Sequence, residues 1–298
     1  MEIAGVFPAL TTPYREDGSV GPELFARNIA RYNRTGLSGY VVLGSTGESV
    51  MLSPSEGESL LAAAKEAAAP GKVLVAGTGA ESTAATIART KRAAEFGFDV
   101  ALVKTPYYYK PAYKAEVFVR HYRSVADASP IPVLLYSVPI FTGVTLDTPE
   151  ILALAEHPNI IGIKDSSGVI QRVVEVVADA GPSFRVLTGG AAVLYPALVA
   201  GARGAILALA SALPERSVAV YESWKNGRYA EALAQQRELA AASKIIVTEA
   251  GIGGLKYAMD LRGYHGGVPR LPLPPPSEAK KQQIHKLVTA FEPAAAAV

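Results

Sequence analysis

A lysine that ends an apolar run is the first residue of this sequence that could do chemistry. Residues 159–168 read NIIGIKDSSG, so three isoleucines lead into Lys164. Burial against apolar groups disfavours a charged ammonium, and a neutral lysine amine adds to ketones. A strand-end lysine can instead simply reach solvent, and Lys104 ends a second apolar run, VALVK, in the same way. Spacing alone does not choose between the two lysines.

Hydroxyl groups follow other apolar runs and could assist such an amine. Residues 44–48 read GSTGE, Tyr136 ends the run IPVLLY, and residues 107–109 are three tyrosines. When a neutral lysine adds to a 2-keto acid and water leaves, the iminium ion draws electrons from a neighbouring C–H or C–C bond, and a phenol can carry the protons. The turn can hold the carboxylate of the keto acid. The GSTGE stretch could instead be a plain glycine-rich turn or a phosphate-binding loop, although no Walker lysine follows it. Tyr136 could be a core tyrosine, and the three tyrosines could simply pack in a loop.

The composition argues against several other kinds of site. The chain of 298 residues has a net charge of +2, no dense block of Lys or Arg and no cysteine, so nucleic-acid binding, disulfides and thiolate metal sites are not expected. Its four histidines are scattered, which disfavours a metal centre. The start, MEIAGVFPAL, lacks the features of a signal peptide, and no apolar run reaches about 18 residues. We therefore expect a cytoplasmic protein with no membrane span and no metal site.

Eight short apolar runs alternate with alanine-rich segments of helical periodicity, and these elements must position the groups above. The runs are residues 5–10, 39–44, 72–78, 100–104, 131–136, 160–164, 184–188 and 204–209. Eight strand–helix units in series predict an α/β fold, a (β/α)8 TIM barrel over residues 1–210, followed by a C-terminal helical extension over residues 211–298. An open doubly wound sheet is the alternative, although no G-x-G-x-x-G opens a helix after a strand.

Local signals refine this arrangement. Ser53-Pro54-Ser55-Glu56 predicts a capping box, and Thr148-Pro149-Glu150 predicts a similar helix start. The stretch GGVPRLPLPPPSE predicts a structural strap before a last helix at residues 277–292. In such a barrel the site lies at the carboxyl ends of the strands, so Lys164, Tyr136 and residues 44–48 are expected to meet at one rim.

Four motifs in order together resemble the pyruvate-dependent class I aldolase family typified by dihydrodipicolinate synthase and N-acetylneuraminate lyase. The motifs are Gly44-Ser45-Thr46-Gly47-Glu48, Thr105-Pro106-Tyr107-Tyr108, Tyr136-x-Val138-Pro139 and Gly162-Ile163-Lys164-Asp165. The match runs over nearly the whole chain, and the four motifs together are highly specific. The resemblance implies a cofactor-free (β/α)8 barrel with C-terminal helices that is commonly a homotetramer. Pyruvate, an aldehyde and further copies of this chain, in a dimer or tetramer, are the expected partners.

The resemblance also implies roles for individual residues. Lys164 matches the lysine that forms the Schiff base, and Tyr136 matches the proton shuttle of the iminium steps. Ser45 takes the place of a threonine that joins the proton relay in the synthase, and Thr46 is the adjacent hydroxyl that holds the carboxylate. Tyr108 matches a relay tyrosine that is lent across a dimer interface.

Further matches concern the substrate pocket. Gly189 and Ile206 fall at positions that line the pyruvate pocket, whereas the resemblance gives Lys104 no role. Where the synthase has an arginine that clamps the carboxylate of aspartate semialdehyde, this sequence has Phe141. Because a phenyl ring cannot replace a bidentate guanidinium, we expect a different acceptor.

Other stretches look closer to the 4-hydroxy-2-oxoglutarate aldolase branch, which yields pyruvate and glyoxylate. They include SPIPVLLYSVP, HPNIIGIKDSSG and YHGG, and that branch uses serines at positions matching Ser45 and Ser166, although its usual GSNGE differs from GSTGE here. The sequence therefore favours a Schiff-base lyase that cleaves a 4-hydroxy-2-keto acid to pyruvate and a small aldehyde, or joins them. The alternatives are dihydrodipicolinate synthase, a sugar-acid (2-keto-3-deoxy) aldolase or dehydratase, and a non-catalytic keto-acid binder.

Overall fold

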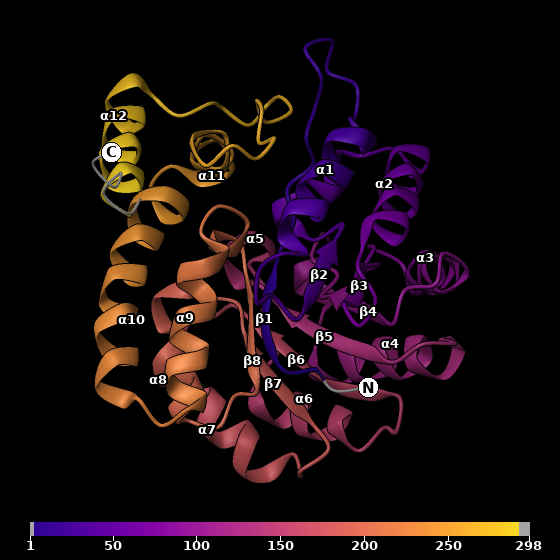
Figure 1. The fold of residues 1–298 in the computed structure, drawn as a ribbon. Coiled ribbons are helices and arrows are strands. Elements are labelled where there is room, and N and C mark those ends of the chain that lie inside the picture. Colours follow the sequence, from indigo (N-terminus) through magenta and orange to yellow (C-terminus); the bar gives the residue numbers. More distant parts are fainter. Residues whose placement is uncertain (1–2, 292–298) are drawn as a thin grey trace, which may run out of the picture.

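A closed parallel β-barrel forms the centre of the molecule (Figure 1) in the computed structural model, which describes residues 3–291. The strands are β1 (Gly5–Pro8), β2 (Gly39–Val42), β3 (Val73–Gly77), β4 (Val100–Lys104), β5 (Val133–Ser137), β6 (Ile160–Asp165), β7 (Arg185–Thr188) and β8 (Gly204–Leu207). They pair in parallel in the order β1-β8-β7-β6-β5-β4-β3-β2, and a bridge between Ala9 and Val41 joins the two ends. Each strand lies within its predicted run or extends it by one residue, so the predicted TIM barrel is confirmed.

Alternation along the strands sends every second side chain into the barrel. The interior is a buried apolar cluster to which all strands but β6 contribute fully buried members, among them Phe7, Val41, Val75, Leu102, Leu134, Leu187 and Ile206. Two residues beyond Leu102 and Leu134, the same alternation reaches Lys104 and Tyr136. The inward row therefore changes from apolar to polar at the carboxyl ends of these strands.

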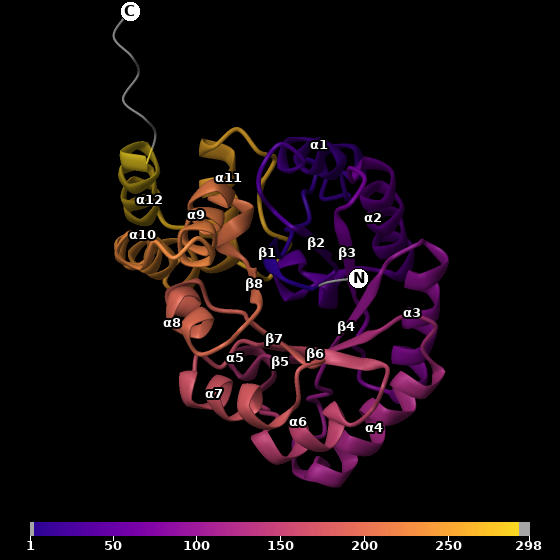
Figure 2. The same ribbon diagram turned by 60° about the horizontal axis from the view of Figure 1, so that its bottom comes forward.

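Helices surround the strands in a ring (Figure 2). They are α1 (Pro22–Tyr32), α2 (Pro54–Ala67), α3 (Thr83–Glu95), α4 (Ala115–Ala128), the short α5 (Pro139–Thr142), α6 (Thr148–Ala155), α7 (Ile170–Asp179), α8 (Leu194–Val199) and α9 (Pro214–Lys225). Within residues 3–291, none of the helices combines the length and the apolar character needed to cross a bilayer.

Three further helices follow this ring, and the first of them lies beside α9 (Figures 1 and 2). They are α10 (Tyr229–Ser243), α11 (Gly251–Leu261) and α12 (Glu278–Phe291), and a π-helical turn (Lys244–Thr248) joins the first two. The predicted last helix agrees with α12, except that residue 292 lies outside the described residues. Because α9 packs against β1 on one side and α10 on the other, it belongs to both layers, and the division at residue 210 stays a proposal.

The predicted helix starts have different outcomes. Ser53 caps α2: its hydroxyl accepts from the N–H of Glu56, and its own N–H donates to the Glu56 carboxylate at 2.8 Å. The helix predicted at Thr148 does begin there, with Pro149 and Glu150 in its first turn. Only the cap is wrong, since α6 is preceded by Asp147 without a side-chain cap, and the Thr148 hydroxyl donates to Glu175 on α7. A neighbouring helix competes for that hydroxyl, and the local sequence does not reveal such a neighbour.

Candidate active site

Three adjacent strands bring Lys104, Tyr136 and Lys164 to one level of the barrel. In the parallel register, Lys104 on β4 pairs with Tyr136 on β5, and Tyr136 pairs with Lys164 on β6. Paired residues of neighbouring strands project to the same face, and the face of Tyr136 is the barrel interior. All three side chains therefore point inward at the carboxyl end, where sites of this fold lie.

Lys164 is almost fully buried, with 4% of its surface exposed. Its Nζ lies 4.2 Å from the centroid of the Tyr136 ring. Among residues 3–291, no carboxylate lies within ion-pairing distance of this Nζ, and the following residue, Asp165, is turned toward Arg172 and Ser167. A buried lysine without a carboxylate partner has no ion pair to break when its nitrogen attacks a carbonyl carbon, so its position suits a nucleophile.

The turn with the sequence GSTGE begins after β2 and is held in a strained conformation. Leu43 and Glu48, on either side of residues 44–47, both adopt positive φ angles, of 60° and 56°. Such angles cost energy in residues other than glycine and are concentrated at functional sites. The Thr12 hydroxyl donates to the Gly47 carbonyl at 2.6 Å, and Gly77 allows Leu43 to approach, since a Cβ at position 77 would lie 2.1 Å from the Leu43 oxygen.

The hydroxyl groups of Ser45, Thr46 and Tyr136 are not used for internal hydrogen bonds with the described part of the chain. Ser45 and Tyr136 line one cavity at the barrel mouth, together with Lys104. Thr46 lies beside Ser45 in a short 3₁₀ turn (Ser45–Gly47) and is buried. The hydroxyls of Ser45 and Tyr136 are therefore available to a ligand in the cavity.

The ends of β6 and β7 bring Ser166 and Gly189 into contact. The N–H of Ser166 donates to the Ser137 carbonyl at 2.9 Å, and the N–H of Gly189 donates to the Asp165 carbonyl at 2.7 Å. A Cβ at position 189 would lie 1.8 Å from Ser166 Oγ, so only glycine leaves room for this hydroxyl. Ile206 on β8 is buried in the barrel interior near this end.

Tyr108 and Phe141 are not buried in this site. Tyr108 is 72% exposed and its ring packs edge-on against Tyr109, while Phe141 on α5 is 63% exposed. The main-chain N–H groups of Tyr107 and Tyr108 both donate to one oxygen of Glu81, each at 2.9 Å. A single chain therefore holds the main chain of the tyrosine loop in place but leaves the Tyr108 side chain at the surface.

A second buried lysine, on α11, holds the end of the GSTGE turn. Lys256 Nζ lies 2.7 Å from Glu48 Oε1, and both side chains are fully buried. The other oxygen of Glu48 accepts from the N–H of Arg270 in the proline-rich strap, and the Arg270 guanidinium binds both oxygens of Glu56. Tyr14 packs under both cations. We call Tyr14, Glu48, Glu56, Lys256 and Arg270 the anchor network.

Sequence reasoning missed the anchor network, although it named the strap as structural. The signal that could have found it is Lys256 itself, a lone cation in the apolar stretch GLKYAMDL. A buried lysine needs a partner, and Glu48 had already been noted in the turn motif. The network ties the C-terminal helices to the turn that carries Ser45 and Thr46.

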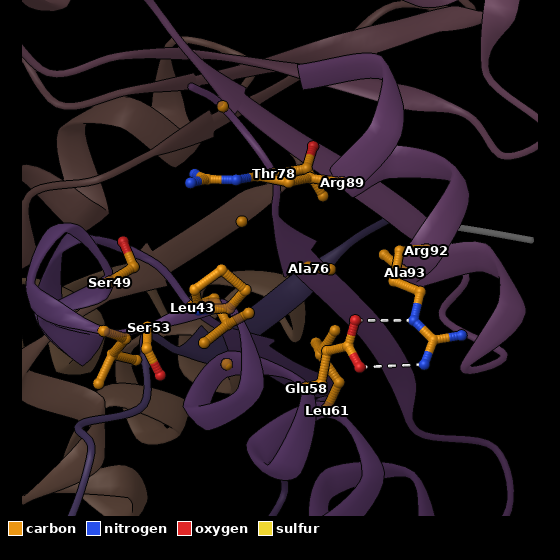
Figure 3. Close-up of a pocket in the computed structure, with 15 residues that line it drawn as sticks. Leu43, Ser49, Ser53, Glu58, Leu61, Ala76, Thr78, Arg89, Arg92 and Ala93 are labelled. Atoms are coloured by element: carbon orange, nitrogen blue, oxygen red, sulfur yellow. Dashed lines mark hydrogen bonds and ion pairs between the residues drawn. The ribbon is translucent and has the colours of Figure 1, made fainter. Parts of the chain in front are cut away.

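A second hollow lies behind this turn, between α2, α3 and β3 (Figure 3). Leu43 and Ser49 line both this hollow and the cavity of Ser45. On its outer side, the Arg92 guanidinium binds the Glu58 carboxylate through two hydrogen bonds of 2.8 and 3.0 Å. The turn thus has open space on two sides, so its position depends on Thr12 and the anchor network.

Comparisons with known proteins agree with this geometry. The model of the dihydrodipicolinate synthetase family matches residues 2–291. The 4-hydroxy-tetrahydrodipicolinate synthase of an Exiguobacterium species is 37% identical over 290 residues, 97% of each chain. That of Methanothrix thermoacetophila is 34% identical over 288 residues, 96% of each chain. The structure of the chloride-inhibited dihydrodipicolinate synthase from Acinetobacter baumannii, complexed with pyruvate, is 30% identical with a TM-score of 0.92, covering 97% of this chain and 98% of that one.

These relatives differ from the branch that the motifs indicated. The curated relatives at 32–37% identity carry the name of the synthase rather than that of a 4-hydroxy-2-oxoglutarate aldolase, so the closer resemblance to that branch is not supported. The short stretches that suggested it are local, whereas these matches extend over nearly the whole chain. The chain belongs to the dihydrodipicolinate synthetase family, and it is a pyruvate-dependent class I aldolase.

Proposed function

We propose that Lys164 forms a Schiff base with pyruvate and that the resulting enamine adds to an aldehyde, or forms by the reverse cleavage. The observation that carries this proposal is the buried Lys164, which faces the Tyr136 ring and has no carboxylate partner among residues 3–291. Its nitrogen attacks C2 of pyruvate, water leaves, and the iminium ion loses a proton from C3. The enamine carbon then bonds to the carbonyl carbon of the aldehyde, whose oxygen takes up a proton, and hydrolysis frees the product.

The other site residues have supporting roles in the proposal. Tyr136 lies against the amine and carries protons for the iminium steps, with Ser45 in the same cavity as the next group of a relay. Thr46 and the N–H groups of the turn hold the pyruvate carboxylate. Ser166, Gly189 and Ile206 shape the pocket at the ends of β6, β7 and β8.

Tyr108 enters this proposal through a second copy of the chain. Its side chain is exposed, and the neighbouring Tyr109 is 67% exposed, so the two rings form an apolar surface that a partner subunit would cover. We therefore propose a homo-oligomer, a dimer or a tetramer, in which Tyr108 completes the relay of its neighbour. Activity per subunit that stays constant on dilution into a monomeric state would contradict this part.

Two acceptors are candidates. The curated relatives are named 4-hydroxy-tetrahydrodipicolinate synthases, which favours aspartate semialdehyde. Glyoxylate, hence 4-hydroxy-2-oxoglutarate as the compound that is cleaved, is the alternative, because Phe141 stands where an arginine would clamp the carboxylate of aspartate semialdehyde. Comparing kcat/KM for the two aldehydes with saturating pyruvate decides between them.

Borohydride reduction in the presence of pyruvate tests the Schiff base directly. The enzyme should lose activity irreversibly and gain the mass of one reduced pyruvate adduct per chain, located at Lys164 by peptide mapping. Lys164→Ala should not be trapped, and Lys104→Met is the matched control, which should still be labelled at Lys164. If Lys164→Ala is still trapped, another lysine forms the Schiff base. No trapping at all would favour a non-catalytic keto-acid binder.

A further inference from the structure

Lys104 places a second ammonium group in the cavity that holds Ser45 and Tyr136. Its side chain is 14% exposed, and its position in the register, opposite Tyr136, turns it inward at the barrel mouth. Gly79 makes room for it, because a Cβ there would lie 2.8 Å from the Lys104 Cγ and 2.6 Å from its main-chain nitrogen. The fold therefore accommodates a long cationic side chain at this position.

The protein neutralises this ammonium only in part. Its one hydrogen bond among residues 3–291 goes to Glu81 Oε1 and is long, at 3.5 Å. The other oxygen of Glu81 is occupied by the main-chain N–H groups of Tyr107 and Tyr108. The Tyr107 ring lies 4.6 Å from Nζ on a further side. An ammonium has three N–H donors, so two remain for a ligand.

The charges around Lys104 favour an incoming anion. Burial lowers the pKa of Lys104, Glu81 opposes this shift, and Arg89 on α3 adds to it. His121 on α4 lies near enough to feel the same ammonium, and burial lowers its pKa to about 4, so it is neutral at pH 7. A carboxylate bound beside Lys104 would restore the electrostatic stabilisation that burial removes.

We propose that Lys104 binds a carboxylate of the acceptor aldehyde and thereby sets the substrate class of the enzyme. The inference rests on the proposed Schiff-base function, in which Thr46 and the turn hold the carboxylate of pyruvate. Tyr136 stands between Lys104 and Lys164 in the register, so an acceptor whose carbonyl meets the enamine on Lys164 extends past Tyr136 toward Lys104. Lys104 then takes over the task of the arginine that Phe141 replaces, and aldehydes with an anionic group are preferred over neutral ones.

The rival explanation is a structural role, in which Lys104 serves only to position Glu81 and, through it, the tyrosine loop. Removing Lys104 would then slow the reaction with every acceptor alike. A ligand role predicts a loss that depends on the charge of the acceptor. A matched pair of two-carbon aldehydes separates the two explanations, since glyoxylate carries a carboxylate where glycolaldehyde carries a neutral hydroxymethyl group.

The experiment measures the ratio of kcat/KM for glyoxylate to kcat/KM for glycolaldehyde, with saturating pyruvate. Lys104→Met keeps the length of the side chain without its charge, and Lys104→Gln is a second neutral variant in case the first does not fold. Either should lower the ratio about tenfold or more, through a higher KM for glyoxylate, because a hydrogen bond to a charged group is lost. Lys104→Arg should keep the preference for the anion. Aspartate semialdehyde is tested as a third, larger anionic acceptor and should follow glyoxylate.

Three results would overturn the inference. A fall in the kcat/KM ratio of less than about tenfold would show that Lys104 does not bind the charged group of the acceptor. If Lys104→Met needs more pyruvate for half-maximal borohydride trapping and its kcat/KM ratio for the two aldehydes is unchanged, Lys104 binds the carboxylate of pyruvate instead. A fall of the same size in Glu81→Gln, which keeps the ammonium and an oxygen for the tyrosine loop, would assign the effect to the Lys104–Glu81 ion pair rather than to contact of Lys104 with the acceptor. If borohydride does not trap the unaltered enzyme, the proposed Schiff-base function fails and this inference with it. If the enzyme is trapped but the ratio is unchanged in Lys104→Met, only this inference fails.

Discussion

Lys164 at the barrel mouth and Lys256 in the C-terminal helices are both buried lysines, and their surroundings are opposite. Lys164 is 4% exposed, faces the Tyr136 ring and has no carboxylate within ion-pairing distance in residues 3–291. Lys256 is fully buried, with Glu48 at 2.7 Å, the Val268 carbonyl at 3.1 Å and the Tyr14 ring at 4.4 Å. The same side chain is therefore without a carboxylate partner in one region and held in an ion pair in the other.

The difference shows that the partner, rather than burial alone, decides what a buried lysine does. A carboxylate stabilises the ammonium and makes the pair a rigid contact, whereas an unpaired amine can attack a carbonyl. The two regions are also connected. Glu48 ends the turn that carries Ser45 and Thr46, so the paired lysine holds in place the groups that serve the unpaired one.

The largest expected effect comes from Lys164→Met, which removes the amine but keeps most of the volume. We expect kcat to fall by about 10⁴-fold or more, because the reaction loses its nucleophile. The free energy of unfolding should change by less than about 1.5 kcal/mol, since no ion pair is broken. Steady-state assays and urea unfolding measure the two quantities. Activity above one hundredth of the original would place the nucleophile elsewhere.

Lys256→Met should affect mainly the free energy of unfolding, in contrast to Lys164→Met, which should affect mainly kcat. It leaves the Glu48 carboxylate buried and unpaired, and we expect a loss of about 3–5 kcal/mol in the free energy of unfolding. Lys281→Met on α12 is a matched control: its partner Glu278 is 83% exposed, so the loss should be much smaller than for Lys256→Met. Adding Glu48→Gln to Lys256→Met should recover part of the stability. If the single variant loses less than 1 kcal/mol, the pair is not the structural contact described here.

Local patterns were sufficient to predict the strands and to place two residues of the candidate site at the strand ends. Short stretches of sequence predict the strands and show that Lys164 and Tyr136 lie near strand ends. Both signals are local: side chains alternate along a strand, and sites of this fold lie at the carboxyl ends of the strands. The inward direction of Lys104 needed the register between β4 and β5, which no single stretch contains. The choice of branch from short stretches was likewise local and is not supported by the relatives.

The anchor network could not be predicted for a different reason. Glu48 and Lys256 are far apart in the chain, and nothing near either residue specifies the other. Their pairing depends on how α11 and the strap pack over the barrel rim, which is a property of the whole fold. The exposure of Tyr108 is similar, since it depends on a surface that only the assembled loop creates.

Tyr136→Phe tests whether the surroundings of Lys164 are organised for proton transfer. The hydroxyl makes no hydrogen bond within the described residues, so its removal should leave stability within about 0.5 kcal/mol. We expect kcat to fall roughly 10²–10³-fold, as is typical when a general acid–base group is lost. Tyr40→Phe is the matched control: its hydroxyl donates to Asn33 at 2.7 Å, so it should lose about 1 kcal/mol of stability and keep its activity. Equal rates for Tyr136→Phe and the unaltered enzyme would remove Tyr136 from the relay.

The smallest expected effect lies at the outer end of the anchor network, where the Arg270 guanidinium lowers the pKa of Glu56 from 4.5 to about 2. A carboxyl group with a lower pKa in the folded state adds stability above the unfolded pKa and loses it as the pH falls through the folded pKa. The contribution of Glu56 should therefore be complete above pH 4.5 and decline toward pH 2. Because both side chains are about a quarter exposed, at 24% and 27%, we expect only about 0.2–1 kcal/mol. Urea unfolding of the unaltered protein and Glu56→Gln between pH 5 and pH 2 measures it. The difference between the two should shrink as the pH falls, whereas a constant difference would mean that Glu56 contributes through contacts that do not depend on its charge.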